Sequence, residues 1–345
     1  MSRVAVVGGG VIGLAIAWRC AERGHEVRVY DPAPGSGATG VAAGMLAPTG
    51  EARFGEEPLH RLLLAAAARW PAFAAELASA SRIDLSYRND GTVLVAGTDD
   101  DLRAVRRLVD FHRRSGLPVR PLTAAEVRDR EPLLSPRVRG GAFLPGDGQV
   151  DPRRVARALL AALPEGTVVT GGEWPADLTV LAAGQATADL VPGLPVRPVK
   201  GQIARLRGDG LTHVIRGQVA NRSVYIVPRA DGEVVVGATE EERGTDTTVT
   251  AGGVLDLLRP AVALVPALAE YELVETSAGL RPGTPDNAPL VGEVAPGTVV
   301  ATGHYRDGVL LAPVTADAIV TLLDTGELPE LFRPFSPDRF AEVAP

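Results

Sequence analysis

The stretch Arg3-Val-Ala-Val-Val-Gly8-Gly9-Gly10-Val-Ile-Gly13, continued to Glu26-Val-Arg-Val-Tyr30-Asp31, decides the fold of this chain. Residues 3–7 form a short apolar run, which is typical of a strand buried on both faces. Gly8, Gly10 and Gly13 then follow in the G-x-G-x-x-G spacing. A helix over 14–23, ended by Gly24, and a second strand over 26–30 complete a predicted βαβ unit. The sequence therefore predicts a Rossmann-like parallel sheet at the start of the chain.

The chemistry of this unit suits a dinucleotide. Gly8 permits a tight turn, Gly10 lets a pyrophosphate approach the backbone, and Gly13 lets the helix pack closely on the strand. The N-terminus of the helix offers unpaired N–H groups and a partial positive charge to phosphates. Asp31, 18 residues after Gly13, can accept hydrogen bonds from a ribose diol. The motif does not separate FAD from NAD, and a glycine-rich turn in a structural βαβ unit is the other interpretation.

Composition excludes several classes of protein. The chain has 345 residues and a net charge of −7, with no basic run, which argues against binding to nucleic acid. A single cysteine, Cys20, excludes an intramolecular disulfide, and the five histidines show no metal-ligand spacing. No run of 18 apolar residues is present, so we expect no membrane span and a cytoplasmic protein.

The pattern of elements predicts an α/β chain (α+β overall) with two interleaved domains. We expect helices over 57–81, interrupted at Pro71, over 98–115, and over 152–163 with Asp151 as the N-cap. Thr123-Ala-Ala-Glu126 predicts a capping box. Strands over 202–207, 214–218, 224–227 and 233–236, separated by turn residues, predict an antiparallel sheet. We expect residues 1–84, 148–196 and 282–345 to form a dinucleotide-binding domain, and 85–147 and 197–281 an inserted substrate-binding domain.

Seven further motifs, spread over nearly the whole chain, carry a resemblance to a known family. They are 38–48 (ATGVAAGMLAP), 148–152 (GQVDP), 181–184 (LAAG), 198–202 (PVKGQ), 225–239 (YIVPR through VGAT), 278–286 (AGLRPGTPD) and 302–313 (TGHYRDGVLLAP). With these motifs, the chain resembles the FAD-dependent D-amino-acid oxidase family, and within it the branch that oxidises glycine. The resemblance implies a D-amino-acid-oxidase type of fold and FAD as the cofactor, bound non-covalently because no cysteine lies late in the chain.

The resemblance also implies which residues contact FAD. They are Gly8, Gly10, Val11, Ile12, Gly13, Asp31, Pro32, Ala38, Thr39, Ala43, Gly44, Met45, Trp174, Gly184, His304, Tyr305, Arg306, Asp307, Gly308, Val309 and Leu310. A loop of glycine and alanine fits this role because small side chains let backbone donors reach a flat ring. Backbone N–H groups of 304–310 would face the flavin edge on which negative charge develops during reduction. Trp174 would contact the adenine from a shortened 170–177 segment, and His304 could be structural or a general base.

Three residues are implied to bind the substrate. Arg281 resembles the arginine that holds the substrate carboxylate, and a guanidinium can donate two parallel N–H···O bonds to it. Arg306 matches a second arginine near the substrate, and Tyr225 would donate its hydroxyl to the same carboxylate. For Arg281 the other interpretation is a surface ion pair, and for Tyr225 a core tyrosine on a sheet.

The resemblance implies oxidative deamination of glycine, with sarcosine and small D-amino acids as further substrates, to the imine, glyoxylate, ammonia and hydrogen peroxide. Dioxygen would be the second substrate, thiazole synthesis for thiamine the use of the product, and the flavin would do the redox chemistry without an obligatory catalytic side chain. We expect a homo-oligomer. The alternatives are a related amine oxidase or a dehydrogenase with another electron acceptor, and a non-catalytic protein that senses a dinucleotide.

Overall fold

The first sheet in the computed structural model carries the predicted βαβ unit. The structure describes residues 1–220 and 222–340, and in these residues the strands form a six-stranded sheet, an eight-stranded sheet and a two-stranded ribbon. In spatial order the six strands are β15 (Leu290–Ala295), β16 (Thr298–Thr302), β9 (Leu178–Leu181), β1 (Arg3–Val7), β2 (Glu26–Tyr30) and β8 (Val168–Val169). All neighbours are parallel except β15 and β16, which form a hairpin. The predicted Rossmann-like sheet is confirmed.

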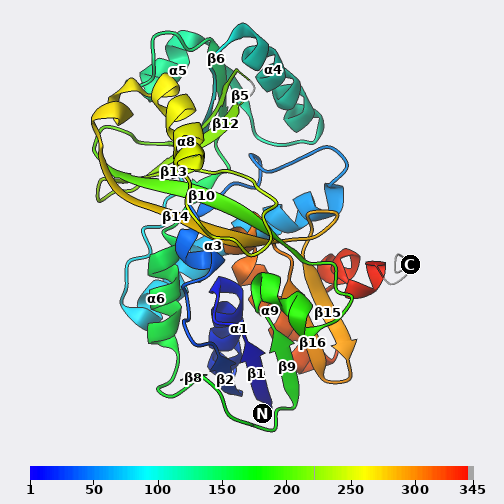
Figure 1. Ribbon diagram of the computed structural model, residues 1–345. Helices are drawn as coiled ribbons and strands as arrows, with labels where there is room; N and C mark the ends of the chain where they lie inside the picture. Colours follow the sequence, from blue (N-terminus) through cyan, green and yellow to red (C-terminus); the bar gives the residue numbers. More distant parts are fainter. Residues whose placement is uncertain (221, 341–345) are drawn as a thin grey trace.

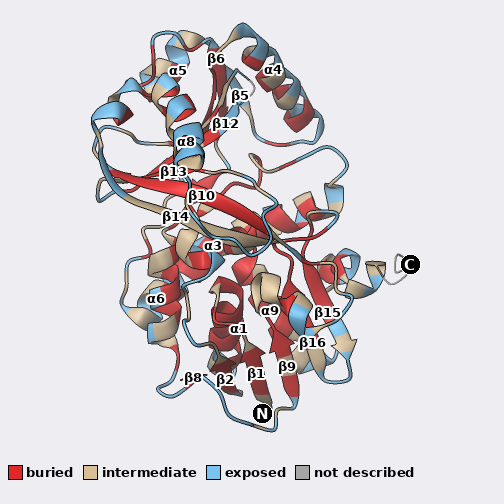
Figure 2. Ribbon diagram, viewed as in Figure 1, coloured by how far each residue is buried: buried red, intermediate tan, exposed pale blue. Residues whose placement is uncertain are grey.

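Four helices accompany this sheet and bury its apolar residues (Figures 1 and 2). They are α1 (Val11–Glu22), α3 (Glu57–Ser81), α6 (Pro152–Ala162) and α9 (Gly308–Thr325). Helix α1 contacts α6 and α9, and α3 contacts the same two helices. The first ten residues of α1 are all buried. Because α1 is packed in this way, its N-terminus is held at the end of β1, and the glycine motif is held there with it.

Helix α9 has the length and hydropathy of a membrane span, with a mean hydropathy of 1.5 over its 18 residues. Slightly more than half of this helix, 56%, is buried inside the protein, and it packs mainly on α1 and α3. The core helix of a globular protein has the same composition.

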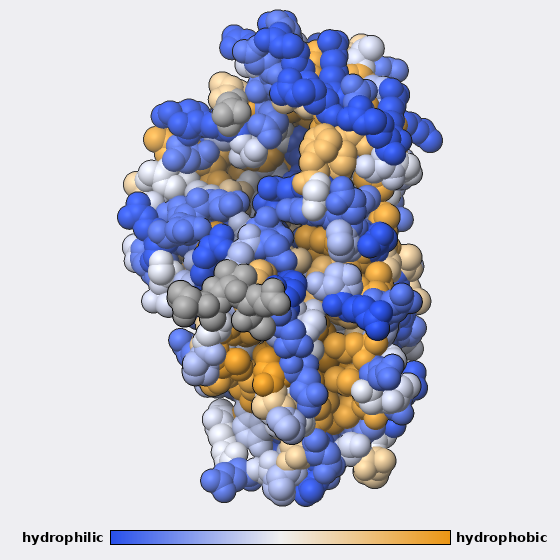
Figure 3. All heavy atoms as spheres, turned by 90° about the vertical axis from the view of Figure 1, so that its right-hand side faces the viewer, coloured by the Kyte–Doolittle hydropathy of each residue, from blue (hydrophilic) through white to orange (hydrophobic). Residues whose placement is uncertain are grey.

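The face shown in Figure 3 is largely hydrophilic, with hydrophobic residues exposed in separate patches between the charged ones.

The second sheet holds most of the strands from the middle of the chain. In spatial order they are β14 (Glu272–Gly283), β10 (Arg197–Arg207), β13 (Glu233–Gly237), β12 (Arg222–Pro228), β11 (Val214–Val219), β4 (Thr92–Ala96), β6 (Gly140–Leu144) and β5 (Arg120–Leu122). Neighbouring strands are antiparallel except β11 and β4, which are parallel. The four strands predicted to form an antiparallel sheet, β10 to β13, do pair antiparallel, so that prediction is confirmed. The parallel pairing of β11 with β4 was not predicted. The two strands are more than a hundred residues apart in the chain, and such a long connection allows parallel pairing.

The remaining elements connect or cover the two sheets. Helices α4 (Asp99–Arg114), α5 (Ala124–Arg130) and α8 (Ala251–Leu264) lie on the eight-stranded sheet, while α2 (Ala38–Val41), α7 (Thr187–Leu190) and the short pair β3 (Met45–Leu46) and β7 (Gly148–Gln149) lie between the larger elements. Short 3-10 helices in the described residues cover Gly184–Ala186, Pro266–Glu270, Glu330–Phe335 and Pro337–Phe340.

Most helix and strand boundaries were predicted correctly from local sequence patterns. The Thr123 capping box and the Asp151 N-cap are both confirmed. The expected break at Pro71 is wrong, because α3 continues through it. A proline inside a helix costs about 3 kcal/mol, and the buried Trp70 and Phe73 on either side of Pro71 stabilise the helix across this position. Helix α1 begins at Val11, three residues before the predicted start, and strand β15 was not predicted.

Candidate active site

One cavity of about 1010 Å³ extends from the glycine motif to the eight-stranded sheet. Of the cofactor-binding residues predicted from the sequence, its wall contains Gly8, Gly10, Val11, Ile12, Asp31, Pro32, Ala38, Thr39, Ala43, Gly44, Met45, Gly184, His304, Tyr305, Arg306, Asp307, Gly308 and Val309. The three predicted substrate-binding residues, Tyr225, Arg281 and Arg306, line the same cavity. These residues come from distant parts of the chain, and the fold brings them to one space.

Three predicted residues lie off this wall. Gly13 packs on β1 instead, because a Cβ there would be 1.9 Å from the carbonyl oxygen of Gly8. Leu310 is buried, and its carbonyl accepts a 2.8 Å hydrogen bond from Nε1 of Trp70. Trp174 lines a separate shallow pocket together with Val7 and Tyr30, two residues that also reach the main cavity. Trp174 is therefore next to the cavity rather than in it.

At the glycine-motif end, the backbone is shaped for close approach. Gly8 has a φ of +109°, and a Cβ there would lie 2.4 Å from the carbonyl oxygen of Ala182. The Asp31 carboxylate accepts the N–H of Gly9 at 2.6 Å and the N–H of Ala33 at 2.7 Å. Both oxygens are thereby fixed at the cavity wall, with further lone pairs available to a hydroxyl group.

At the other end of the cavity, Arg281 on β14 extends over β10. Its Nη1 donates to the carbonyl oxygen of Thr239 at 3.1 Å. Within the described part of the chain, no carboxylate lies at ion-pair distance from Arg281, so its charge is available to an anion in the cavity. The surface ion pair considered from the sequence is absent from these residues.

Tyr225 on β12 lies beside Arg281 and lines the same wall. A Cβ at Gly237, its cross-strand partner, would be 2.4 Å from the tyrosine hydroxyl oxygen. Burial raises the pKa of Tyr225, and the positive charges of Arg281 and Arg216 oppose this only in part. The hydroxyl group therefore stays protonated at neutral pH and can donate a hydrogen bond.

A group of buried charges lies next to Tyr225, and the sequence did not reveal it. Nη1 of Arg216 on β11 lies 2.5 Å from Oε1 of Glu51, and Nε of Arg306 lies 3.7 Å from Oε2 of the same carboxylate. Burial alone would raise the pKa of Glu51, but the two guanidinium groups hold it below its ordinary value. Glu51 is thus an anion that joins two arginines. Arg306, unlike Arg281, already has a carboxylate partner.

Two more buried carboxyl groups lie near this ion pair. Burial raises the pKa of Asp307 to about 8, and the negative charge of Glu51 adds to the effect. Burial also raises the pKa of Asp147 to about 7, although the charge of Arg216 and two backbone N–H donors oppose it. Both carboxyl groups are therefore substantially protonated near neutral pH, which limits the negative charge on this side of the cavity.

His304 was predicted either as a structural residue or as a base. Its Nε2 lies 3.0 Å from Oγ1 of Thr315 on α9, and burial lowers its pKa to about 3. The ring is neutral at physiological pH and is held against a helix by this contact. This geometry suits a structural residue on the cavity wall.

The sequence profile of the FAD dependent oxidoreductase family matches residues 3–322. The chain belongs to this family. It is 36% identical over 363 residues to a glycine oxidase of Geobacillus kaustophilus, with 96% of each chain covered. It is 33% identical to the bifunctional protein ThiO/ThiG of Synechocystis sp., with 98% of this chain and 54% of that protein covered.

Solved structures agree with this assignment. The glycine oxidase of Geobacillus kaustophilus superposes with a TM-score of 0.91 at 34% identity, and covers 98% of this chain and 99% of its own. An iminodiacetate oxidase of Chelativorans sp. BNC1 gives a TM-score of 0.85 at 26% identity, with 97% and 99% covered. The oxidoreductase fold predicted from the sequence, a parallel sheet joined to a mostly antiparallel one, is confirmed.

The residues of this chain fit the FAD that the family uses. The Gly8 turn, whose positive φ suits glycine, lets a phosphate approach the backbone, and the fixed Asp31 carboxylate can accept from a ribose hydroxyl. Cys20, the sole cysteine in the sequence, is buried in α1 and away from the cavity wall, and burial raises its pKa to about 12. It offers no reactive thiol to the flavin, which supports non-covalent binding.

Proposed function

We propose that this oxidoreductase oxidises glycine, and with it sarcosine and small D-amino acids, to the imine, which hydrolyses to glyoxylate and ammonia. The observation that carries the proposal is Arg281, a cavity-lining arginine with no carboxylate partner in the described chain and with the Tyr225 hydroxyl beside it. A carboxylate is the anion whose geometry matches a guanidinium group. The glycine oxidases among the relatives support glycine as the amine.

The residues of the chain bind and orient the substrate. Arg281 and Tyr225 hold the carboxylate, so that the amine and the Cα–H face the remainder of the cavity in a fixed direction. FAD supplies the hydride acceptor when bound. Arg306 is held by Glu51, so its charge stabilises an anion nearby without being free to move toward it. The ionisable groups with raised pKa values, Asp147 and Asp307, limit the opposing negative charge.

A screen of the purified, FAD-loaded protein tests this proposal. Oxygen consumption, hydrogen peroxide and glyoxylate are measured with glycine, sarcosine, D-alanine and D-proline at equal concentrations. We expect the highest kcat/KM with glycine or sarcosine and one peroxide for each oxygen consumed. Turnover of none of the four amines under these conditions would contradict the proposal.

Repeating the screen with an artificial dye as electron acceptor distinguishes an oxidase from a dehydrogenase. A dehydrogenase would reduce an artificial dye with the amine but would consume little oxygen, whereas an oxidase does both. As further parts of the proposal, the product serves thiazole synthesis for thiamine, and the protein is a cytoplasmic homo-oligomer. The ThiO relatives support the first of these.

A further inference from the structure

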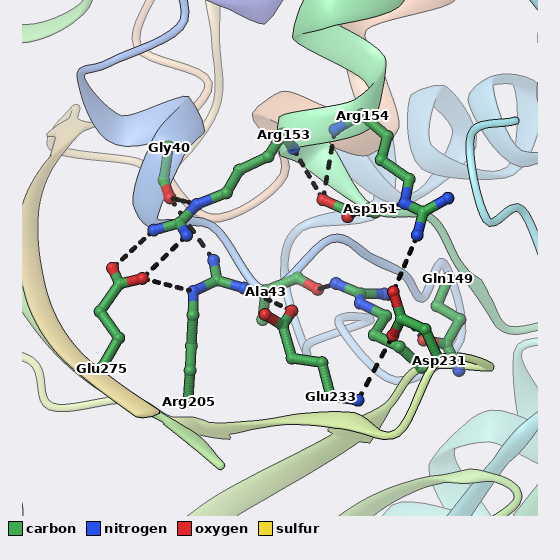
Figure 4. Close-up of polar contacts among 11 residues, drawn as sticks. Gly40, Ala43, Gln149, Asp151, Arg153, Arg154, Arg205, Asp231, Glu233 and Glu275 are labelled. Carbon is green, nitrogen blue, oxygen red and sulfur yellow. Dashed lines mark hydrogen bonds and ion pairs between the residues drawn. The ribbon is translucent and has the colours of Figure 1, made fainter. Parts of the chain in front are cut away.

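Arginine side chains from outside the cavity hold the backbone of residues 40–43, and residues 41–43 of this segment line the cavity. Arg153 on α6 donates from Nε to the carbonyl oxygen of Gly40 at 2.7 Å and pairs with Glu275 through both terminal nitrogens, at 2.6 and 2.9 Å (Figure 4). Nη2 of Arg205 on β10 approaches the same oxygen at 3.4 Å. Two arginines thus reach one carbonyl oxygen from α6 and from the eight-stranded sheet, and each has a carboxylate partner of its own.

A third arginine differs from these two. Arg229 directly follows β12 and is only 5% exposed, and it donates to two neutral oxygens. These are Oε1 of Gln149, at 2.8 Å, and the carbonyl oxygen of Ala43. Of the residues in 1–220 and 222–340, no carboxylate lies at ion-pair distance from Arg229. Burial lowers its pKa to about 10, so the guanidinium group still carries its charge at neutral pH. A buried cation with only neutral partners is costly to keep.

The peptide bond between Ala43 and Gly44 connects this cation to the cavity. The only cis peptide in the described chain is Gly237–Ala238, so the Ala43–Gly44 bond is trans, and its C=O and N–H point in opposite directions. The carbonyl points to Arg229, which is not on the cavity wall, whereas Ala43 and Gly44 both are. The Gly44 N–H has no acceptor among the described residues.

We propose that Arg229 is a positioning residue for FAD: it fixes the Ala43–Gly44 peptide so that the Gly44 N–H is a donor pointing into the cavity. A hydrogen bond from a cation polarises the peptide and strengthens the donor at its other end. The donor and the positive charge behind it stabilise negative charge in the cavity, which increases when FAD is reduced. The inference rests on FAD as the cofactor and does not depend on which amine is oxidised.

Gly44 itself supports this function of the segment. Its φ is +75°, and a Cβ there would lie 2.0 Å from the carbonyl oxygen of Val150. The carbonyl of Gly44 accepts the N–H of Val150 at 2.9 Å, while Oγ1 of Thr39 accepts the N–H of Val11 at 2.9 Å. The segment is therefore fixed to the glycine-motif end of the cavity as well, and Arg229 determines the orientation of one peptide within it.

The test compares Arg229→Met and Arg229→Lys with a matched control, Arg154→Met. Arg154 also lies near this segment, on α6 beside Arg153, but its partners are the carboxylates of Asp231, Asp151 and Asp84, and it donates to no carbonyl of 40–45. The measurements are the dissociation constant of FAD by titration of apoprotein, the midpoint potential of the bound flavin, and the melting temperature of the apoprotein.

For Arg229→Met we expect FAD to bind at least tenfold more weakly and the potential to fall by about 30 mV, which is a tenfold lower preference for the reduced form in a two-electron couple. For Arg229→Lys, whose single ammonium group cannot span both oxygens, we expect three- to tenfold weaker binding. Arg154→Met should bind FAD within twofold of the wild type, with an unchanged potential.

A purely structural role for Arg229 gives a different result. It would lower the melting temperature of the apoprotein while leaving the potential of the bound flavin unchanged, and this outcome would overturn the proposal. If Arg229→Met does not fold, Arg229→Lys is the deciding variant, because it keeps the buried charge. Wild-type FAD affinity and flavin potential in Arg229→Lys would also overturn the proposal. Neither readout uses glycine, so failure here and failure of the glycine assignment are distinguishable.

Discussion

Gly201 and Arg281 lie on the paired strands β10 and β14, and a Cβ at Gly201 would be only 2.4 Å from Nη2 of Arg281. The guanidinium group lies over the position that a side chain at 201 would occupy. Glycine at this position is therefore part of the proposed substrate site, although it touches no substrate. It determines where Arg281 can lie in the cavity.

Gly201→Ala should move the guanidinium group by about an ångström, which can cost up to about a hundredfold in rate. We expect kcat/KM for glycine to fall roughly 10- to 100-fold with unchanged FAD content. Gly252→Ala is the matched control, because Gly252 lies on α8 with open space around its Cβ position. Equal kinetics in the two variants would show that Gly201 does not determine the position of Arg281 during catalysis.

Arg281→Ala removes the side chain that we assign to the substrate carboxylate. A bidentate charged pair contributes about 3–4 kcal/mol, so kcat/KM for glycine should fall roughly 10²- to 10³-fold. Arg281→Lys should restore little of the lost kcat/KM, because an ammonium group cannot donate two parallel hydrogen bonds to a carboxylate. A surface ion pair would predict a change below about 1 kcal/mol. Near-normal glycine kinetics in a variant with full FAD content would remove Arg281 from the site.

The parts of this site that depend on local sequence could be predicted. The turn at Gly8, the helix start and the acid at Asp31 lie within one βαβ unit, where spacing determines geometry. The charged group around Glu51 could not be predicted, because it depends on long-range register. Arg216 lies opposite Tyr225 in the β11–β12 pairing, and Glu51 reaches it from a loop 165 residues earlier. Nothing in the sequence near Glu51 distinguishes it from an exposed loop residue.

The position of the Trp174 ring could not be predicted from the sequence either. The resemblance implies an adenine contact from the shortened 170–177 segment. The structure places the ring in a shallow pocket that shares Val7 and Tyr30 with the main cavity, with the Arg28 guanidinium 4.9 Å from the ring centroid. A surface loop has few contacts that fix its path, so its position relative to the cavity does not follow from sequence spacing.

Asp31→Asn tests the cofactor end of the cavity. Asparagine keeps the size of the side chain, but it loses the charge and one of the two acceptor oxygens that receive the N–H groups of Gly9 and Ala33. A hydrogen bond to a charged group contributes about 1.5–3 kcal/mol, so FAD affinity should fall roughly ten- to a hundredfold. Turnover at saturating FAD should stay near the wild-type value. Unchanged affinity in a titration of apoprotein would exclude Asp31 from the ribose site.

Asp147 should make the stability of the protein depend on pH. Its Oδ1 accepts the N–H groups of Thr49 at 3.0 Å and Gly50 at 3.4 Å, and it thereby holds the loop that carries Glu51. Burial raises the pKa of this carboxyl group from 3.8 to about 7. Between these two pH values the folded protein binds more protons than the unfolded chain. The contribution of Asp147 is therefore complete below about pH 4 and is lost as the pH rises through about 7.

Asp147→Asn removes this titration but keeps an acceptor oxygen for the two backbone N–H groups. The free energy of unfolding of the wild type should decrease between pH 5 and pH 8, and that of Asp147→Asn should decrease less. The difference should be roughly 2–4 kcal/mol at most, since each unit of pKa shift corresponds to about 1.4 kcal/mol. Urea unfolding of both apoproteins at several pH values measures it. Asp110→Asn, an exposed site on α4, is the control and should follow the wild-type profile. Parallel profiles for the wild type and Asp147→Asn would mean that this carboxyl group does not titrate in the folded protein near neutral pH.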